Sequence, residues 1–182
     1  MCKRAKISRL LAALISVGLT ILTSSSTQAA SGQEPARLVL SGVIGPGAFL
    51  RFKAELDRTN PQVVVVDGPG GRVFEAVLIG TEIRRRGLAT VVPRNRSCAS
   101  ACTIVFLSGR TKSLQTGASL GLHAAADGGI AADPAGTKFM YGYLSRVGLS
   151  KQMAREMAAV PPDQVKWLTA SQQRALGVRV DR

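Results

Sequence analysis

The chain has 182 residues, of which 24 are Lys or Arg and 11 are Asp or Glu, so its formal net charge is +13. Aromatic residues make up 4% of the sequence and form no basic, aromatic-rich stretch of the kind that stacks on bases. The positive charge therefore does not indicate a nucleic-acid partner.

The first thirty residues have the order of segments that is typical of a secretory signal peptide. Residues 1–9 hold four cations and no acid, LLAALISVGLTIL is an apolar run of thirteen residues, and TSSSTQAAS is small and polar. Thr27 and Ala29 fit the small-x-small cleavage rule, so we expect residues 1–29 to be removed. The alternative is a retained N-terminal anchor, although thirteen apolar residues are short for a membrane span.

Cleavage after Ala29 predicts a periplasmic or secreted protein whose formal charge falls from +13 to +9. Residues 30–36 form a flexible lead-in, and residues 37–182 are long enough for one domain with its own core. Two cysteines remain, Cys98 and Cys102, and an oxidising compartment favours a disulfide between them. The sequence alone is compatible with either a disulfide or two free thiols. Two cysteines and one distant histidine are too few ligands for zinc, so we expect no metal and no cofactor.

Strand and helix patterns alternate along the domain. Strands are expected at 36–44, 62–68 and 89–93, and helices at 47–59 and at 72–88, where Gly87 is a stop signal.

The second half of the chain continues this alternation. Helices are expected at 97–109, 139–148, 150–160 and 161–168, a strand edge at 119–125, a loop at 125–136, and a short helix, Gly177 and a strand at 169–181. Such an order predicts an α/β domain with a largely parallel sheet and flanking helices.

The motif DGPGG, residues 67–71, follows the continuous strand VVVV and precedes a helix. Backbone N–H groups of a glycine turn beside a helix N-terminus can bind negative charge. The phosphate-loop lysine and the dinucleotide fingerprint are absent, which favours a developing oxyanion over a phosphate. The alternative is an ordinary turn.

Ser100 lies midway between the two cysteines, and its small neighbours suit either helix packing or a nucleophile site. A serine nucleophile needs a general base, and His123, the single histidine, closes the apolar strand GLHAA. The third residue that would orient this histidine is Asp163, which alternatively caps the predicted helix at 161–168.

These blocks resemble the proteolytic subunit of Clp protease, within the wider Clp-protease/crotonase-like fold, whose sheet is built from ββα-type units. The resemblance covers residues 62–182 and is strongest to exported Clp-protease-like proteins of the predicted periplasmic group. DGPGG resembles the oxyanion turn, CASACTIVFLSG the nucleophile helix and SLGLHAA the strand of the catalytic histidine; WLTASQQRALGVRVD follows the C-terminal pattern.

The resemblance implies Ser100 as the nucleophile and His123 as the base. Asp163 lies about two residues from the position of the family's acid. The oxyanion hole would be formed by the N–H groups of Gly70 or Gly71 and of Ala101. The family has no cysteines at the two positions that flank Ser100 here.

Two functions remain in competition. One is an exported, ATP-independent serine peptidase that acts through a Ser100 acyl-enzyme on peptides or unfolded segments, with no ATPase partner. The other is a catalytically inactive, peptide-binding scaffold of the same fold. A homo-oligomer is expected in either case, with the helices at 138–160 as its interface. Tyr141, Tyr143, Leu144 and Met153 supply its apolar contacts unless they are buried in the domain's own core.

Overall fold

The computed structural model describes residues 34–128 and 131–181, and Glu34–Arg182 form one compact unit. The predicted signal peptide, residues 1–29, and most of the lead-in lie outside the described residues. No helix in the described part of the chain is long and apolar enough to span a bilayer.

The first half of the domain contains the predicted alternation of strands and helices. Its elements are β1 (Arg37–Ile44), α1 (Ala48–Thr59), β2 (Val63–Gly71), α2 (Val73–Arg86) and β3 (Ala89–Val92). Helix α2 ends where the sequence predicted, because Gly87 adopts a left-handed φ of 65° and its N–H donates to the Arg84 carbonyl.

The second half adds nine short elements. They are β4 (Ser97–Ala99), α3 (Ala101–Leu107), β5 (Lys112–Leu114), β6 (Ser119–Leu122), α4 (Pro134–Arg146), α5 (Lys151–Ala158), β7 (Lys166–Trp167), α6 (Ala170–Ala175) and β8 (Val178–Val180). Gly177 has a φ of 67° between α6 and β8, which confirms the expected C-terminal helix, glycine and strand.

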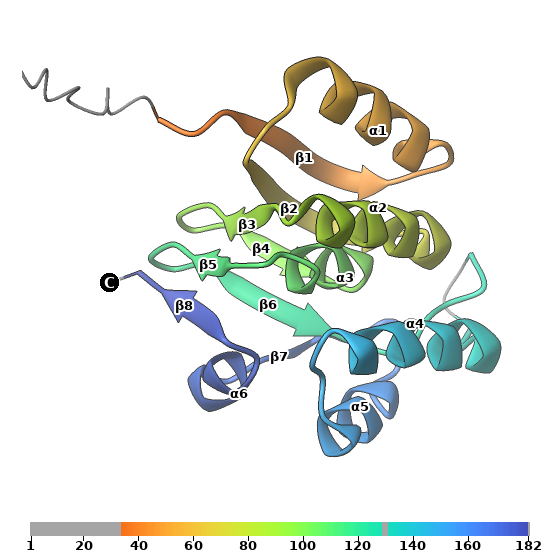
Figure 1. Ribbon diagram of the computed structural model, residues 1–182. Coiled ribbons are helices and arrows are strands. Elements are labelled where there is room, and N and C mark those ends of the chain that lie inside the picture. Colours follow the sequence, from red (N-terminus) through yellow and green to blue (C-terminus); the bar gives the residue numbers. More distant parts are fainter. Residues whose placement is uncertain (1–33, 129–130, 182) are drawn as a thin grey trace, which may run out of the picture. The chain divides into compact units, whose positions relative to one another are not determined.

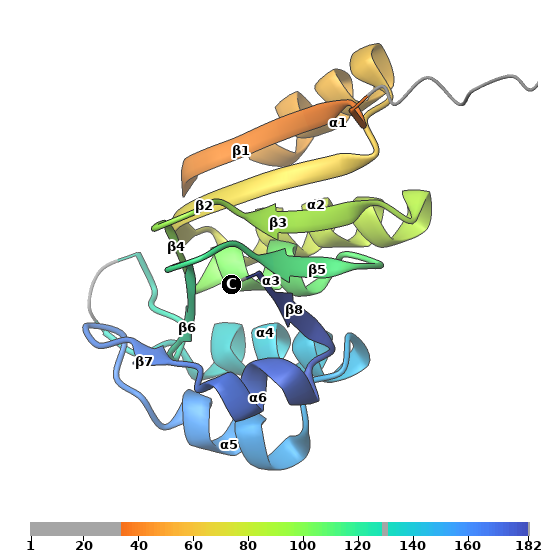
Figure 2. The ribbon, with the colours of Figure 1, turned by 90° about the vertical axis from the view of Figure 1, so that its left-hand side faces the viewer.

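The strands form one curled, almost entirely parallel sheet. Neighbouring strands pair in the order β7-β6-β4-β2-β3-β5-β8, and β1 also pairs with β2. The pair β6–β7 is antiparallel. Strand β2 pairs with β3 near its start and with β4 at Gly68, so the sheet divides along its length. Figure 2 shows β4 and β6 running steeply across the direction of β3 and β5, and Figure 1 shows α1, α2 and α3 on one side of the strands.

Three local predictions need correction, and one strand was missed. The segment 97–109 is not one helix, because strand β4 precedes helix α3 within it. The motif DGPGG is not a separate turn, because β2 continues through it and pairs with β1 there. The segment 161–168 is not helical: after two prolines the chain makes a turn and then pairs with β6 as β7. Strand β5 was not predicted, since three residues gain their strand conformation from pairing with β3 and β8.

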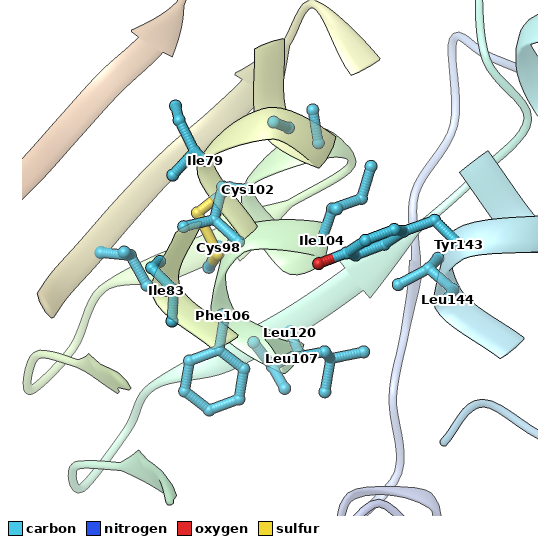
Figure 3. Packing of buried hydrophobic residues seen from close by; sticks show 14 of the residues in the cluster. Ile79, Ile83, Cys98, Cys102, Ile104, Phe106, Leu107, Leu120, Tyr143 and Leu144 are labelled. Atoms are coloured by element: carbon cyan, nitrogen blue, oxygen red, sulfur yellow. A yellow bond between two sulfur atoms is a disulfide. The ribbon is translucent and has the colours of Figure 1, made fainter. Parts of the chain in front are cut away.

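The core lies between the sheet and the helices and includes the expected interface residues. Tyr141, Tyr143, Leu144 and Met153 are all buried in this domain. Figure 3 shows Tyr143 and Leu144 of α4 facing the side chains of α3, and the Tyr143 hydroxyl lies 2.9 Å from the Ser108 hydroxyl. These side chains are therefore part of the domain's own core, which was the alternative to their forming an oligomer interface.

Candidate active site

Ser100 occupies a sharp turn between a strand and a helix. It follows β4 and is the N-cap of α3, with φ 54° and ψ −126°, and its side chain makes no capping hydrogen bond. A left-handed φ is disfavoured for a serine and costs about 1–3 kcal/mol, so such positions persist only where the surroundings enforce them. A serine on a strained strand-to-helix turn is also the arrangement that exposes nucleophiles in hydrolases of other folds.

Three sets of contacts hold this turn. The Ser100 N–H donates to the Gly121 carbonyl of β6 at 2.9 Å. The buried Thr103 hydroxyl lies 2.9 Å from both the Cys98 and the Gly121 carbonyl oxygens, which links α3 to β4 and β6. A disulfide joins Cys98 to Cys102, with the two α-carbons 5.2 Å apart. The two cysteines do not share a helix, as the helix predicted at 97–109 would require, because Cys98 belongs to β4.

The end of β2 lies directly against the Ser100 turn. Gly70 has φ 100°, and a Cβ atom added there would lie 2.7 Å from the Ala101 nitrogen and 2.8 Å from Ser100 Cβ. No side chain fits in that space, so a glycine is required both for its conformation and for the close approach. The structure therefore packs the second glycine of DGPGG directly against the backbone of the first residue of α3.

His123 follows β6 at the other side of the same region. Its Nδ1 lies 2.6 Å from the Ala124 carbonyl oxygen. A carbonyl can only accept, so this contact places the proton of the neutral ring on Nδ1 and leaves Nε2 as an acceptor. An acceptor nitrogen is what a general base for a serine hydroxyl requires.

Ser100 and His123 line one cavity of about 1000 Å³. Its walls come from the β1–α1 turn, the end of β2 and start of α2, the segment after β6, the start of α4, and Pro162. No hydrogen bond joins Ser100 Oγ to His123 among the described residues, and catalytic contacts are often longer without substrate than with it. The two predicted catalytic residues are thus brought together at one opening.

Asp163 is placed differently from the other predicted residues. It lies in a turn, not at the start of a helix, and its side chain is exposed. Its neighbour Pro162 lines the cavity, while Asp163 is absent from the described lining. The His123 ring contacts a carbonyl oxygen instead of a carboxylate. The assignment of Asp163 as third catalytic residue therefore stays a prediction.

Two other acidic residues near the site have structural contacts. Asp133 lines the cavity, but its Oδ1 accepts from the Gly136 N–H at 2.9 Å and so caps α4. Asp67, the first residue of DGPGG, is largely buried, and its Oδ2 lies 3.0 Å from Arg96 Nε. This ion pair links β2 to the segment that leads into β4, and so supports the position of the Ser100 turn.

Sequence reasoning missed an aromatic pair and a cation on the cavity wall. Phe74 of α2 and Phe139 of α4 stack with ring centroids 6.3 Å apart, and both are exposed at the cavity, as is Arg72. Arg72 and Phe74 come directly after the glycine motif, which is the signal that would have indicated them. An apolar wall beside a nucleophile suits an apolar part of a ligand.

The described residues contain no group of three His, Cys, Asp or Glu side chains placed to bind a metal ion. The arrangement that they do contain is a strained serine, a histidine with a free acceptor nitrogen, and a glycine packed on a helix N-terminus. These groups are the ones used in acyl transfer through a serine nucleophile.

The fold is that of the Clp-protease-like proteins. By sequence, no family profile and no curated protein matches the chain. Among solved structures, ClpP1 from Listeria monocytogenes has a TM-score of 0.61 at 15% identity, with 80% of this chain and 92% of that chain covered.

A membrane-bound stomatin-specific protease, 1510-N, is also similar. In a mutant form in complex with a substrate peptide, it gives a TM-score of 0.58 at 21% identity, covering 82% of this chain and 76% of that chain. At these identities the likeness establishes the fold, which confirms the expected fold class.

Proposed function

We propose that this protein is an exported serine hydrolase that cleaves peptides or unfolded protein segments. Ser100 attacks the scissile carbonyl, His123 accepts its proton through Nε2 and passes it to the leaving amine, and water then hydrolyses the acyl-enzyme. The N–H groups of Ala101 and of Gly70 or Gly71 stabilise the oxyanion. The single observation that carries this proposal is that Ser100, in a strained turn, shares a cavity with the only histidine of the chain.

The same proposal includes export, through the predicted signal peptide, and action without an ATPase, because ATP is not supplied outside the inner membrane. It also includes self-association, for which the buried residues of α4 and α5 cannot be the main contacts. Intact mass of protein recovered from the periplasm tests cleavage after Ala29, and light scattering coupled to gel filtration tests self-association.

The proposal is tested with the full chain, expressed and recovered after export. Wild type, Ser100→Ala and His123→Ala are incubated with a fluorophosphonate probe, which labels activated serines. Labelling of wild type that is lost in both variants supports the hydrolase. Labelling that survives in Ser100→Ala would contradict it, because another serine would then be the reactive one.

The second candidate function is a peptide-binding scaffold without catalysis. It is favoured by the exposed position of Asp163 and by the absence of a described hydrogen bond between Ser100 and His123. If folded wild type binds an unfolded protein segment but is neither labelled nor cleaves it, this second function is the correct one.

A further inference from the structure

We propose that the Cys98–Cys102 disulfide is a positioning device that keeps Ser100 in its reactive backbone conformation. The proposal rests on the proposed hydrolase function, and it concerns two residues that contact neither substrate nor the reacting atoms. The disulfide spans the turn symmetrically: Cys98 lies two residues before Ser100 in β4, and Cys102 lies two residues after it in α3.

The need for such a device follows from the backbone of Ser100. Three non-glycine residues in the described chain have positive φ: Asn60, Asn95 and Ser100. Asparagine tolerates this conformation because of its short amide side chain, but serine does not share that tolerance. Ser100 therefore depends on its surroundings more than the two asparagines do.

The disulfide is the covalent restraint on the turn, and the other contacts there are hydrogen bonds. The Ser100 N–H and the Thr103 hydroxyl connect the turn to Gly121 of the neighbouring strand, and the Thr103 hydroxyl also contacts the Cys98 carbonyl across the turn. The disulfide fixes the two ends of the turn with their α-carbons 5.2 Å apart. A fully extended chain would separate residues four apart by about 13 Å, so the bond excludes an opened, relaxed turn.

Global stabilisation is a poor alternative explanation for the bond. A disulfide restrains the unfolded chain least when it closes a short loop, and these two cysteines are only four positions apart. The bond is also buried: Cys98 is 0% and Cys102 3% exposed, and Figure 3 shows both cysteines among the side chains of the hydrophobic core. Its restraint acts mainly on the turn that carries the nucleophile.

The test compares the full-length wild type with the double variant Cys98→Ala/Cys102→Ala, which removes the bond with little change in side-chain volume. Fluorophosphonate labelling is resolved into the probe affinity, KI, and the maximal rate of bond formation, kinact. We expect kinact to fall by at least about ten-fold, since small displacements of a nucleophile have large effects. KI should stay unchanged, because all the lining residues of the cavity except Ser100 come from other parts of the chain.

The matched control is Leu56→Ala, a fully buried position on α1 that leaves the disulfide and the site intact. It should lower stability while kinact of the folded protein stays at the wild-type value. Equal losses of kinact in both proteins would overturn the proposal, because the effect would then follow stability. A folded double variant with wild-type kinact would overturn it as well.

A structural measurement keeps the inference distinct from the proposed function. In NMR spectra, the φ-sensitive coupling and the exchange rate of the Ser100 amide are recorded for wild type and double variant. We expect loss of the positive φ and faster exchange without the disulfide. If wild type is not labelled at all, the hydrolase function fails, and an unchanged Ser100 φ would still overturn the positioning role.

Discussion

Gly70 and Ala101, thirty-one positions apart in sequence, are packed so closely that a single methyl group does not fit between them: a Cβ on Gly70 would lie 2.7 Å from the Ala101 nitrogen. This contact joins the end of β2 to the start of α3 and defines one wall of the Ser100 turn. It connects the glycine motif with the segment of the predicted nucleophile, and the sequence could associate the two only by resemblance.

Gly70→Ala is therefore expected to damage both the fold and the site. The new methyl group meets backbone atoms of Ala99 and Ala101, and φ 100° is unfavourable for alanine. We expect a loss of about 3 kcal/mol in the free energy of unfolding and no fluorophosphonate labelling. Urea unfolding and labelling provide the measurements.

Gly142→Ala is the matched control for that substitution. Gly142 lies exposed in α4, and a Cβ there meets no atom within 4 Å. Alanine should raise the free energy of unfolding by about 0.5–1 kcal/mol, with labelling unchanged. Equal behaviour of the two variants would show that the close contact at Gly70 is unimportant.

Asp163→Asn is expected to label at close to the wild-type rate. The Ala124 carbonyl contacts Nδ1 of His123, and the Asp163 side chain is exposed. The comparison is with His123→Ala, which should not label. If Asp163→Asn loses labelling to the same extent, the carboxylate orients His123 in the working site, and the triad predicted from the sequence is correct.

Glu75 should stabilise the turn at the rim of the cavity. Its two carboxylate oxygens accept hydrogen bonds from the Gly47 and Phe49 N–H groups, at 2.9 and 2.8 Å. Glu75, on α2, thus provides acceptors for backbone N–H groups at the start of α1. Glu75→Ala should lower the free energy of unfolding by about 1–2 kcal/mol, and Glu75→Gln by less, because an amide keeps one acceptor oxygen. Glu55→Gln, on the exposed side of α1, serves as the control and should have little effect. Urea unfolding at pH 7 measures the three variants, and a Glu75→Ala protein as stable as wild type would contradict the capping role.

Acid should weaken the domain partly through Glu82. Hydrogen bonds from Arg85, together with those from Arg86, lower the pKa of this carboxyl from 4.5 to about 2. The folded protein thus binds the proton less readily than the unfolded chain does. The stabilisation is complete above pH 4.5 and is lost as the pH falls toward 2.

Comparison with Glu82→Gln isolates this contribution. At pH 7 wild type should be more stable than the variant by about 1 kcal/mol, a modest value because Arg85 is exposed to water. Urea unfolding at pH 7 and pH 3 should show that the difference shrinks at the lower pH. A difference that is the same at both values would exclude Glu82 as a source of acid sensitivity.

The sequence by itself determined the elements whose signals are local. Helix α2 could be predicted because its apolar spacing, cationic last turn and Gly87 all lie within one segment, and β1 and the start of β2 are continuous apolar runs. The α/β class followed from the alternation of these elements, and the Clp-protease-like fold followed from the resemblance of the motifs. Ser100 and His123 were predicted as nucleophile and base because a serine among small residues and a lone histidine are visible as residue types.

Only the tertiary structure decided what depends on pairing across the chain. Residues 97–99 and 112–114 are strands because neighbouring strands accept their hydrogen bonds, and residues 166–167 pair with β6 although their own segment suggested a helix. The strain at Ser100 and the contact of Gly70 with Ala101 are products of the same packing. Short elements and special backbone conformations have little local preference, so long-range contacts determine them.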